Sequence, residues 1–205
     1  KTMNSYYSIW SELVFLKIST DLVDQNICPN LPVMFRADLC EQCDISQIPD
    51  KKSEYGCLYI LNELATGDLK SFLLNYPFTK NELYSAYLQI FLGLYCLKRY
   101  FSLNHTDLHW GNVLYLELEK GSTDTPTFWE YKISKDFTIH VPIYKHVFKI
   151  WDFGRSIIPS KVISLEIKSK YLEIEDLDQF QDFERIISMI EVEPEDTKPK
   201  QKNFF

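Results

Sequence analysis

The stretch His105-Thr106-Asp107-Leu108-His109-Trp110-Gly111-Asn112, followed downstream by Asp152-Phe153-Gly154, decides which fold this chain is expected to adopt. The first stretch has the pattern H-x-D-x-x-x-x-N and follows a long helical pattern. The second is a D-F-G at the end of the apolar run 147–151. Neither motif is specific alone. Together, in this order, they predict one site that gathers two aspartates and an asparagine.

These three side chains match what phosphoryl transfer requires, which is a carboxylate to accept a hydroxyl proton and cations to neutralise the phosphates. Asp107 is the candidate base. Asn112 and Asp152 offer hard oxygen ligands, which suit Mg²⁺. The alternative is that all three side chains cap local turns. The shared order of helix, motif, strand, strand and motif favours the catalytic interpretation.

Two metal interpretations compete with this one. His105 and Asp107, with His140 or His146, could form the two-histidine, one-carboxylate triad of a non-haem iron oxygenase. A long capped helix directly before the motif argues against the barrel that such an enzyme needs. The pair at Cys40 and Cys43 could supply half of a zinc site, but no second pair completes it, and an ordinary loop is favoured.

Composition excludes several classes of protein. The 205 residues are 45% apolar, enough for a packed core, and the net charge of −7 argues against a nucleic-acid partner. The longest uncharged apolar run, residues 90–97, is too short to cross a membrane. Five cysteines without a regular framework suit a reducing compartment, so we expect a cytoplasmic protein. None of the six glycines forms a G-x-G, which excludes Rossmann and P-loop nucleotide sites.

Local patterns predict helices over 6–18, 68–74 and 180–190, and strands over 31–35, 57–61, 113–116 and 147–151. The best helix follows Thr79, which forms a capping box with Glu82, and its apolar stripe continues to Phe101. Residues 38–54 are expected to form a polar hairpin loop, and residues 117–146 an insert with an extra hairpin. The polar tail from 191 is expected to be disordered.

Between residues 5 and 158 the chain resembles the eukaryotic-type protein kinase superfamily. That resemblance implies an α+β, two-lobed fold, with a partial N-lobe over 1–66, a mainly helical C-lobe over 67–190 containing the insert 117–146, and a tail over 191–205. It implies that Glu12 is the helix carboxylate that pairs with a strand lysine. It also implies that Asn62 is the gatekeeper, that the backbone from Glu63 to Ala65 faces adenine, and that Asp68 contacts the ribose. His105 and Phe153 match the apolar spine between the lobes. A plain solvated carboxylate at Glu12 and a helix N-cap at Asp68 are the alternatives.

The chain also departs from the family pattern. Thr106 replaces the arginine that clamps a phosphorylated activation loop, and no A-P-E follows Gly154. His109 gives a D-L-H-x-G-N that is similar to the aminoglycoside and choline phosphotransferases. Three aspartates compete for the role of the helix-F aspartate, namely Asp176, Asp178 and Asp182. The long insert and the stretch Phe148–Ser156 look most like the divergent kinases of large DNA viruses, which would place the protein in host cytoplasm or a virion.

The resemblance implies ATP and Mg²⁺ as cofactors and a protein substrate with Ser or Thr hydroxyls. It gives no indication of nucleic-acid or membrane partners, and the oligomeric state is open. The alternatives are a small-molecule phosphotransferase and a pseudokinase that acts as a binding module. No glycine-rich loop and no V-A-I-K strand precede Glu12, and Lys1 is the candidate for the strand lysine although it lies close to Glu12 in the sequence. We therefore expect the N-lobe to be incomplete, and residues 1–205 alone to bind Mg-ATP weakly and to transfer phosphate negligibly.

Overall fold

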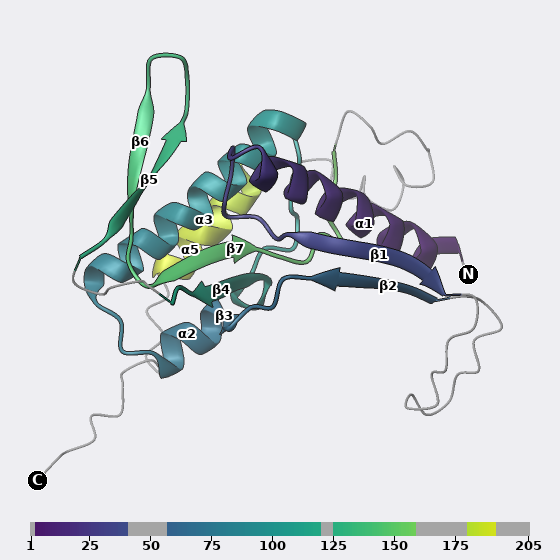
Figure 1. The fold of residues 1–205 in the computed structure, drawn as a ribbon, viewed down its shortest axis with the longest axis horizontal. Coiled ribbons are helices and arrows are strands. Elements are labelled where there is room, and N and C mark those ends of the chain that lie inside the picture. The colour runs from purple at the N-terminus through teal and green to yellow at the C-terminus, as the bar shows by residue number, and fades with distance from the viewer. Residues whose placement is uncertain (1–2, 41–56, 120–124, 159–179, 192–205) are drawn as a thin grey trace, which may run out of the picture.

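The computed structural model describes residues 3–40, 57–119, 125–158 and 180–191, which form a mixed α+β fold (Figure 1). Its helices are α1 (Met3–Asp24), α2 (Leu69–Asn75), α3 (Lys80–Phe101) and α5 (Gln181–Glu191), with a 3₁₀ turn at Trp110–Asn112. Its strands are β1 (Met34–Cys40), β2 (Cys57–Asn62), β3 (Gly67–Asp68), β4 (Val113–Glu117), β5 (Thr127–Lys132), β6 (Thr138–Ile143) and β7 (His146–Ile150).

Helix α3 forms the centre of the core, as its sequence pattern predicts. The Thr79 side chain accepts a hydrogen bond from the Glu82 amide at 3.2 Å, and the Glu82 carboxylate accepts one from the Thr79 amide at 2.8 Å. The helix ends at Ser102, whose φ of 52° is left-handed. The predicted stripe is buried along the middle of the helix, so local capping and apolar periodicity agree with the tertiary packing.

A three-stranded antiparallel sheet in the order β3-β4-β7 carries both sequence motifs. Val113 pairs with Ile150, so the start of β4 lies beside the end of β7. Every residue of β7 is buried. This register brings the loop that ends at Asn112 next to the residues that follow β7, which include Asp152.

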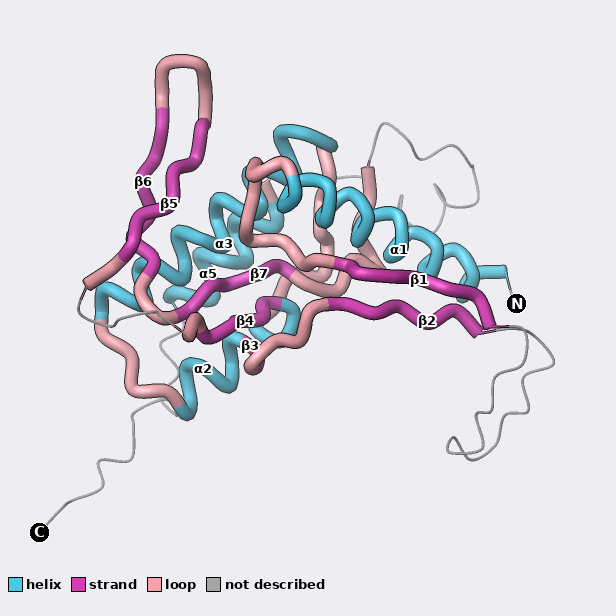
Figure 2. Tube along the Cα trace, viewed as in Figure 1, coloured by secondary structure: helices cyan, strands magenta, loops and turns pink. Residues whose placement is uncertain are grey.

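Helix α1 and the hairpin-like pair β1-β2 lie together, whereas α2, α3 and α5 gather beside the β3-β4-β7 sheet (Figure 2). The predicted strand over 31–35 is wrong at its start, because β1 begins only at Met34. Residues 30–33 form a turn whose polar groups bond to other elements: Asn30 to β7 and the Val33 amide to the Glu63 carboxylate. The predicted polar loop lies mostly outside the described residues, and its first residues continue β1.

The insert forms the predicted extra hairpin. Strands β5 and β6 pair in register from Thr127↔Ile143 to Lys132↔Thr138, and the turn end of the hairpin projects away from α3 (Figure 1). Its apolar face packs on α3 in a second core cluster that contains Leu92, Tyr131 and Val141. The Tyr95 hydroxyl on α3 also donates to the Ile133 carbonyl at 3.2 Å.

The remaining expectations differ in outcome. The predicted helices at 6–18, 68–74 and 180–190 are confirmed as α1, α2 and α5, with α1 longer than predicted. The two-lobed arrangement and the domain boundaries stay predictions. The tail from 192 lies outside the described residues. Within the described part of the chain, no helix combines the length and apolar character that crossing a membrane requires.

Candidate active site

The backbone of the Asp107 loop is fixed by helix α5. The buried Asp182 carboxylate accepts hydrogen bonds from the amides of His105 at 2.6 Å and Thr106 at 3.0 Å. The Arg185 guanidinium donates to the Thr106 carbonyl at 2.5 Å. Thr106 has a φ of 63°, a left-handed conformation that is costly for a β-branched residue. Asp182 and Arg185 thus hold a strained turn directly before the candidate base.

Asp107, Asn112 and the segment before Asp152 are joined by hydrogen bonds. The Asn112 side-chain amide donates to the Asp107 carbonyl at 2.9 Å, and the Asn112 carbonyl accepts from the Trp151 amide at 2.8 Å. Asp152 has a φ of 62°, and one of its carboxylate oxygens accepts from the Gly154 amide at 3.2 Å. The structure therefore brings together the three side chains that the motifs predicted.

The donor atoms of this group fit a hard divalent cation. The Asn112 side-chain nitrogen is bonded to Asp107, and the side-chain oxygen of Asn112 has no hydrogen bond among the described residues. The second carboxylate oxygen of Asp152 has none among them either. An amide oxygen and a carboxylate oxygen are ligands that Mg²⁺ accepts, and Mg²⁺ takes its other ligands from water and phosphate. Asn112 and Asp152 are the residues that could hold such an ion.

The rings of His105 and Phe153 connect the loop to helix α1. Phe153 is fully buried, with its ring centroid 5.6 Å from that of His105 and 6.2 Å from that of Phe15 on α1. A ring nitrogen of His105 bonds to the Trp151 carbonyl at 2.8 Å. Burial lowers the pKa of His105, so the imidazole is neutral at neutral pH. The two residues predicted to form an apolar spine are in contact.

Glu12 on α1 lies close enough to Asp152 for the two carboxylates to interact. Burial raises the pKa of this half-buried carboxyl, and the carboxylate of Asp152 raises it further. In the described part of the chain no lysine or arginine pairs with Glu12, and Lys1 lies outside that part. The structure thus places Glu12 next to the site without the cation that the predicted role requires.

Glu63 holds the end of β2 to β7. Its carboxylate oxygens lie 2.6 and 2.8 Å from the Lys149 ammonium, and one of them accepts from the Val33 amide at 2.8 Å. The side chains of Lys149 and Glu63 are only 9% and 15% exposed. The Glu63 amide also donates to the Val33 carbonyl at 3.0 Å, so both the side chain and the backbone N–H of Glu63 are occupied within the fold. The contact of the backbone from Glu63 to Ala65 with adenine stays a prediction.

Asp68 caps helix α2. Its carboxylate accepts from the Ser71 amide at 2.6 Å, and the Ser71 hydroxyl accepts from the Asp68 amide at 3.1 Å. The N-cap interpretation of Asp68 is therefore observed. The contact with a ribose stays a prediction.

Arg155 is a site residue that the motifs did not predict. Its guanidinium lies 3.3 Å from the Asp107 carboxylate, and its carbonyl accepts from the Thr106 hydroxyl at 2.6 Å. The side chain is 72% exposed, so this pair contributes little to stability but places a positive charge beside the candidate base. The position directly after Gly154 was the only available signal in the sequence.

The described residues do not form the histidine and carboxylate triad of an iron oxygenase. His105 is bonded to Trp151, His140 is exposed on the hairpin and His146 lies at the far end of β7. Across residues 3–40, 57–119, 125–158 and 180–191, no three His, Cys, Asp or Glu side chains are arranged to hold a metal ion. Cys43 lies outside these ranges.

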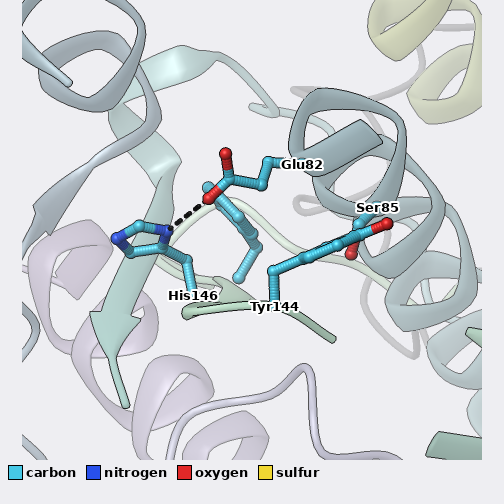
Figure 3. A pocket seen from close by; sticks show the side chains of 5 residues that line it. Glu82, Ser85, Tyr144 and His146 are labelled. Carbon is cyan, nitrogen blue, oxygen red and sulfur yellow. Dashed lines mark ion pairs between the residues drawn. The ribbon is translucent and has the colours of Figure 1, made fainter. Parts of the chain in front are cut away.

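A small hollow lies at the opposite end of β7 from Asp152, lined by Glu82, Ser85, Tyr144, His146 and Phe148 (Figure 3). The Glu82 carboxylate points to the His146 ring, 4.0 Å away, and both side chains are buried. Neither ring nitrogen of His146 has a hydrogen-bond partner among the described residues. Burial lowers the pKa of His146, although the charge of Glu82 opposes that shift. The hollow belongs to the core packing and not to the candidate site.

Among known proteins, the chain matches solved structures but no family model and no curated protein. One of these structures is a chain of the crystal structure of the yeast RNA Pol II CTD kinase CTDK-1 complex, at 18% identity and a TM-score of 0.39. The match covers 70% of this chain and 35% of that chain. An overlap at that score carries no argument about function, which rests on the site itself.

Proposed function

We propose that this chain carries the catalytic centre of a divergent protein kinase that transfers the γ-phosphate of ATP to Ser or Thr hydroxyls. The observation that carries the proposal is the joined group of Asp107, Asn112 and Asp152. The Asn112 amide bonds to the Asp107 carbonyl and the Asn112 carbonyl to the Trp151 amide, so one hydrogen-bonded frame joins the candidate base to the two residues that would hold Mg²⁺.

In the proposed step, the acceptor oxygen bonds to the γ-phosphorus while the bond from that phosphorus to the β–γ bridging oxygen breaks. ADP leaves with the electron pair, and the hydroxyl proton passes to the Asp107 carboxylate. When bound, Mg²⁺ would neutralise charge on the phosphates, held by Asn112 and Asp152. The hydrogen bonds from α5 keep the Asp107 loop from relaxing, and this preorganisation is what positions the acceptor.

A second candidate function is a binding module without turnover. It is favoured by Glu12, which has no cation paired with it in the described residues and whose pKa is raised by burial and further by Asp152. A kinase needs a lysine paired with this helix carboxylate to hold the phosphates. The two functions differ in one respect, which is whether nucleotide binding is followed by transfer.

The test is Asp107→Asn in the full-length natural protein, with Asp136→Asn as the matched control. Asp136 is an exposed aspartate at the turn of the insert hairpin. Transfer of labelled γ-phosphate to Ser/Thr peptides should fall about 10²–10⁴-fold for Asp107→Asn and stay unchanged for Asp136→Asn. ATP binding should persist in both variants.

Each other outcome identifies an alternative. Near-full transfer by Asp107→Asn would refute the assignment of the base. Binding of Mg-ATP without transfer by the wild type would favour the binding module. Asp107-dependent transfer to aminoglycosides or choline, but not to peptides, would favour a small-molecule phosphotransferase.

A further inference from the structure

Tyr131, on the insert hairpin, reaches the turn that follows α1. Its hydroxyl donates a hydrogen bond to the Asn30 side-chain oxygen, and the side chains are almost completely buried. Burial raises the pKa of Tyr131, so the phenol stays protonated and remains a donor. The insert is thereby connected to a segment 101 residues earlier in the chain.

Asn30 is bonded to β7 through both its side chain and its backbone. The Asn30 side-chain amide donates to the Phe148 carbonyl at 2.8 Å, and the Asn30 carbonyl accepts from the Ile150 amide at 3.0 Å. Gln89 on α3 completes the network, because its oxygen accepts from Asn30 at 3.2 Å and from the Phe148 amide at 2.9 Å. The hydroxyl of Tyr131 satisfies the side-chain oxygen that would otherwise be buried without a partner.

The packing around Asn30 leaves little room for adjustment. A Cβ on Gly93 of α3 would lie 2.9 Å from the Ile150 side chain and 3.2 Å from the Asn30 Cβ. Helix α3, β7 and the turn are therefore in close contact at this point. A change in the hydrogen bonding of Asn30 must be taken up by movement of the turn.

This turn connects two parts of the candidate site. It follows α1, which carries Glu12, and it is bonded to β7, which ends two residues before Asp152. Phe15 of α1 also contacts Phe153. The turn therefore links the helix that carries Glu12 to the strand that leads to Asp152.

We infer that Tyr131 is a positioning residue, through which the insert hairpin fixes the turn at Asn30 and so aligns Glu12 with Asp152. The part of this inference that concerns phosphate transfer rests on the proposed function. The hydrogen bond by which Tyr131 stabilises the turn at Asn30 does not depend on the proposed function, and its effect can be measured separately.

The experiment compares Tyr131→Phe with Tyr95→Phe in the full-length natural protein. Each variant removes one phenolic hydroxyl that links the hairpin region to the rest of the protein, but Tyr95 bonds to the Ile133 carbonyl and not to the turn. Leaving the Asn30 oxygen buried and unpaired should speed amide exchange at residues 28–33 and 148–151 by about 5- to 150-fold. Tyr95→Phe should leave exchange in these two segments unchanged. Equal exchange in both variants would overturn the inference.

Transfer activity gives the second measurement. Tyr131→Phe should lower the rate of transfer at saturating peptide and raise the KM for Mg-ATP, whereas Tyr95→Phe should change neither. Faster exchange in the turn with unchanged kinetics in an active enzyme would overturn the positioning role. If the wild type transfers no phosphate, the proposed function fails, and the exchange data still decide whether Tyr131 braces the turn. Should Tyr131→Phe not fold, Gly93→Ala perturbs the same turn from α3 and should accelerate exchange in the same segments.

Discussion

Replacing Asp182 by alanine should destabilise the chain at the candidate site more than any nearby surface change. Asp182 is 8% exposed, and its carboxylate accepts from two backbone amides, at 2.6 and 3.0 Å. Each buried amide left without a partner costs about 1–3 kcal/mol, so losing both should cost about 2–6 kcal/mol. Against a total stability of about 5–15 kcal/mol for a typical domain, this is a large fraction.

Urea unfolding measures this cost, and Glu184→Ala is the matched control. Glu184 is exposed, and it lies with Asp182 in the first turn of α5, so its removal reproduces any loss of helix-dipole stabilisation alone. Asp182→Asn should be intermediate, because the amide keeps one acceptor oxygen. The left-handed turn at Thr106 should relax in Asp182→Ala, and amide exchange at residues 105–107 should rise with it.

Unfolding of Asp182→Ala and Glu184→Ala at the same urea concentration would refute the expected cost of losing the Asp182 carboxylate. A destabilised Asp182→Ala with unchanged amide exchange around Asp107 would mean that the carboxylate supports α5 and not the loop. Asp176 and Asp178, which compete for this role in the sequence, lie outside the described residues.

Three further predictions follow from the contacts of the site and of β7. Asp152→Ala should weaken binding of Mg-ATP far more than binding of metal-free ATP in calorimetric titrations, and equal losses would mean a structural role. Lys149→Met should cost about 3–5 kcal/mol in urea unfolding because it leaves the Glu63 carboxylate buried and unpaired, whereas the double variant with Glu63→Gln should recover part of the loss. Burial lowers the pKa of His146 in the folded protein below its ordinary value of 6.5. On acidification the His146 ring is therefore protonated at a higher pH in the unfolded chain than in the folded protein, so the free energy of unfolding should fall as the pH drops below about 6.5. His146→Phe should reduce the fall in Tm on acidification, and an unchanged fall would contradict this.

Features with local causes were predictable from the sequence. The capping box at Thr79 and Glu82 and the apolar stripe behind it specify α3, and the structure reproduces both. The motifs also predicted the grouping of Asp107, Asn112 and Asp152. The alternating pattern of the insert predicted a hairpin, which the paired β5 and β6 confirm.

Features that depend on distant partners were not predictable. Lys149 stands in the middle of an apolar strand, but nothing in the sequence names Glu63, 86 residues away, as its partner. The hydrogen bonds of Asn30 to β7 and of Val33 to Glu63 explain why the strand predicted at 31–35 starts late. The choice of Asp182 over two nearby aspartates likewise depends on a loop 77 residues earlier in the chain.

Three consecutive residues of β7 hold two polar connections to the α1-β1-β2 part of the chain, beside the ring contact of Phe15 with Phe153. Phe148 and Ile150 bond to Asn30 at the end of the α1 turn, and Lys149 pairs with Glu63 at the end of β2. We expect attachment points so close together on one strand to act as a pivot for α1 with β1 and β2. A rotation about this pivot should change the distance from Glu12 to Asp152 and the packing of Phe15 on Phe153, but should leave Asp107 and Asn112 in place. Distances between spin labels on α1 and α3, with and without nucleotide, would reveal such a rotation.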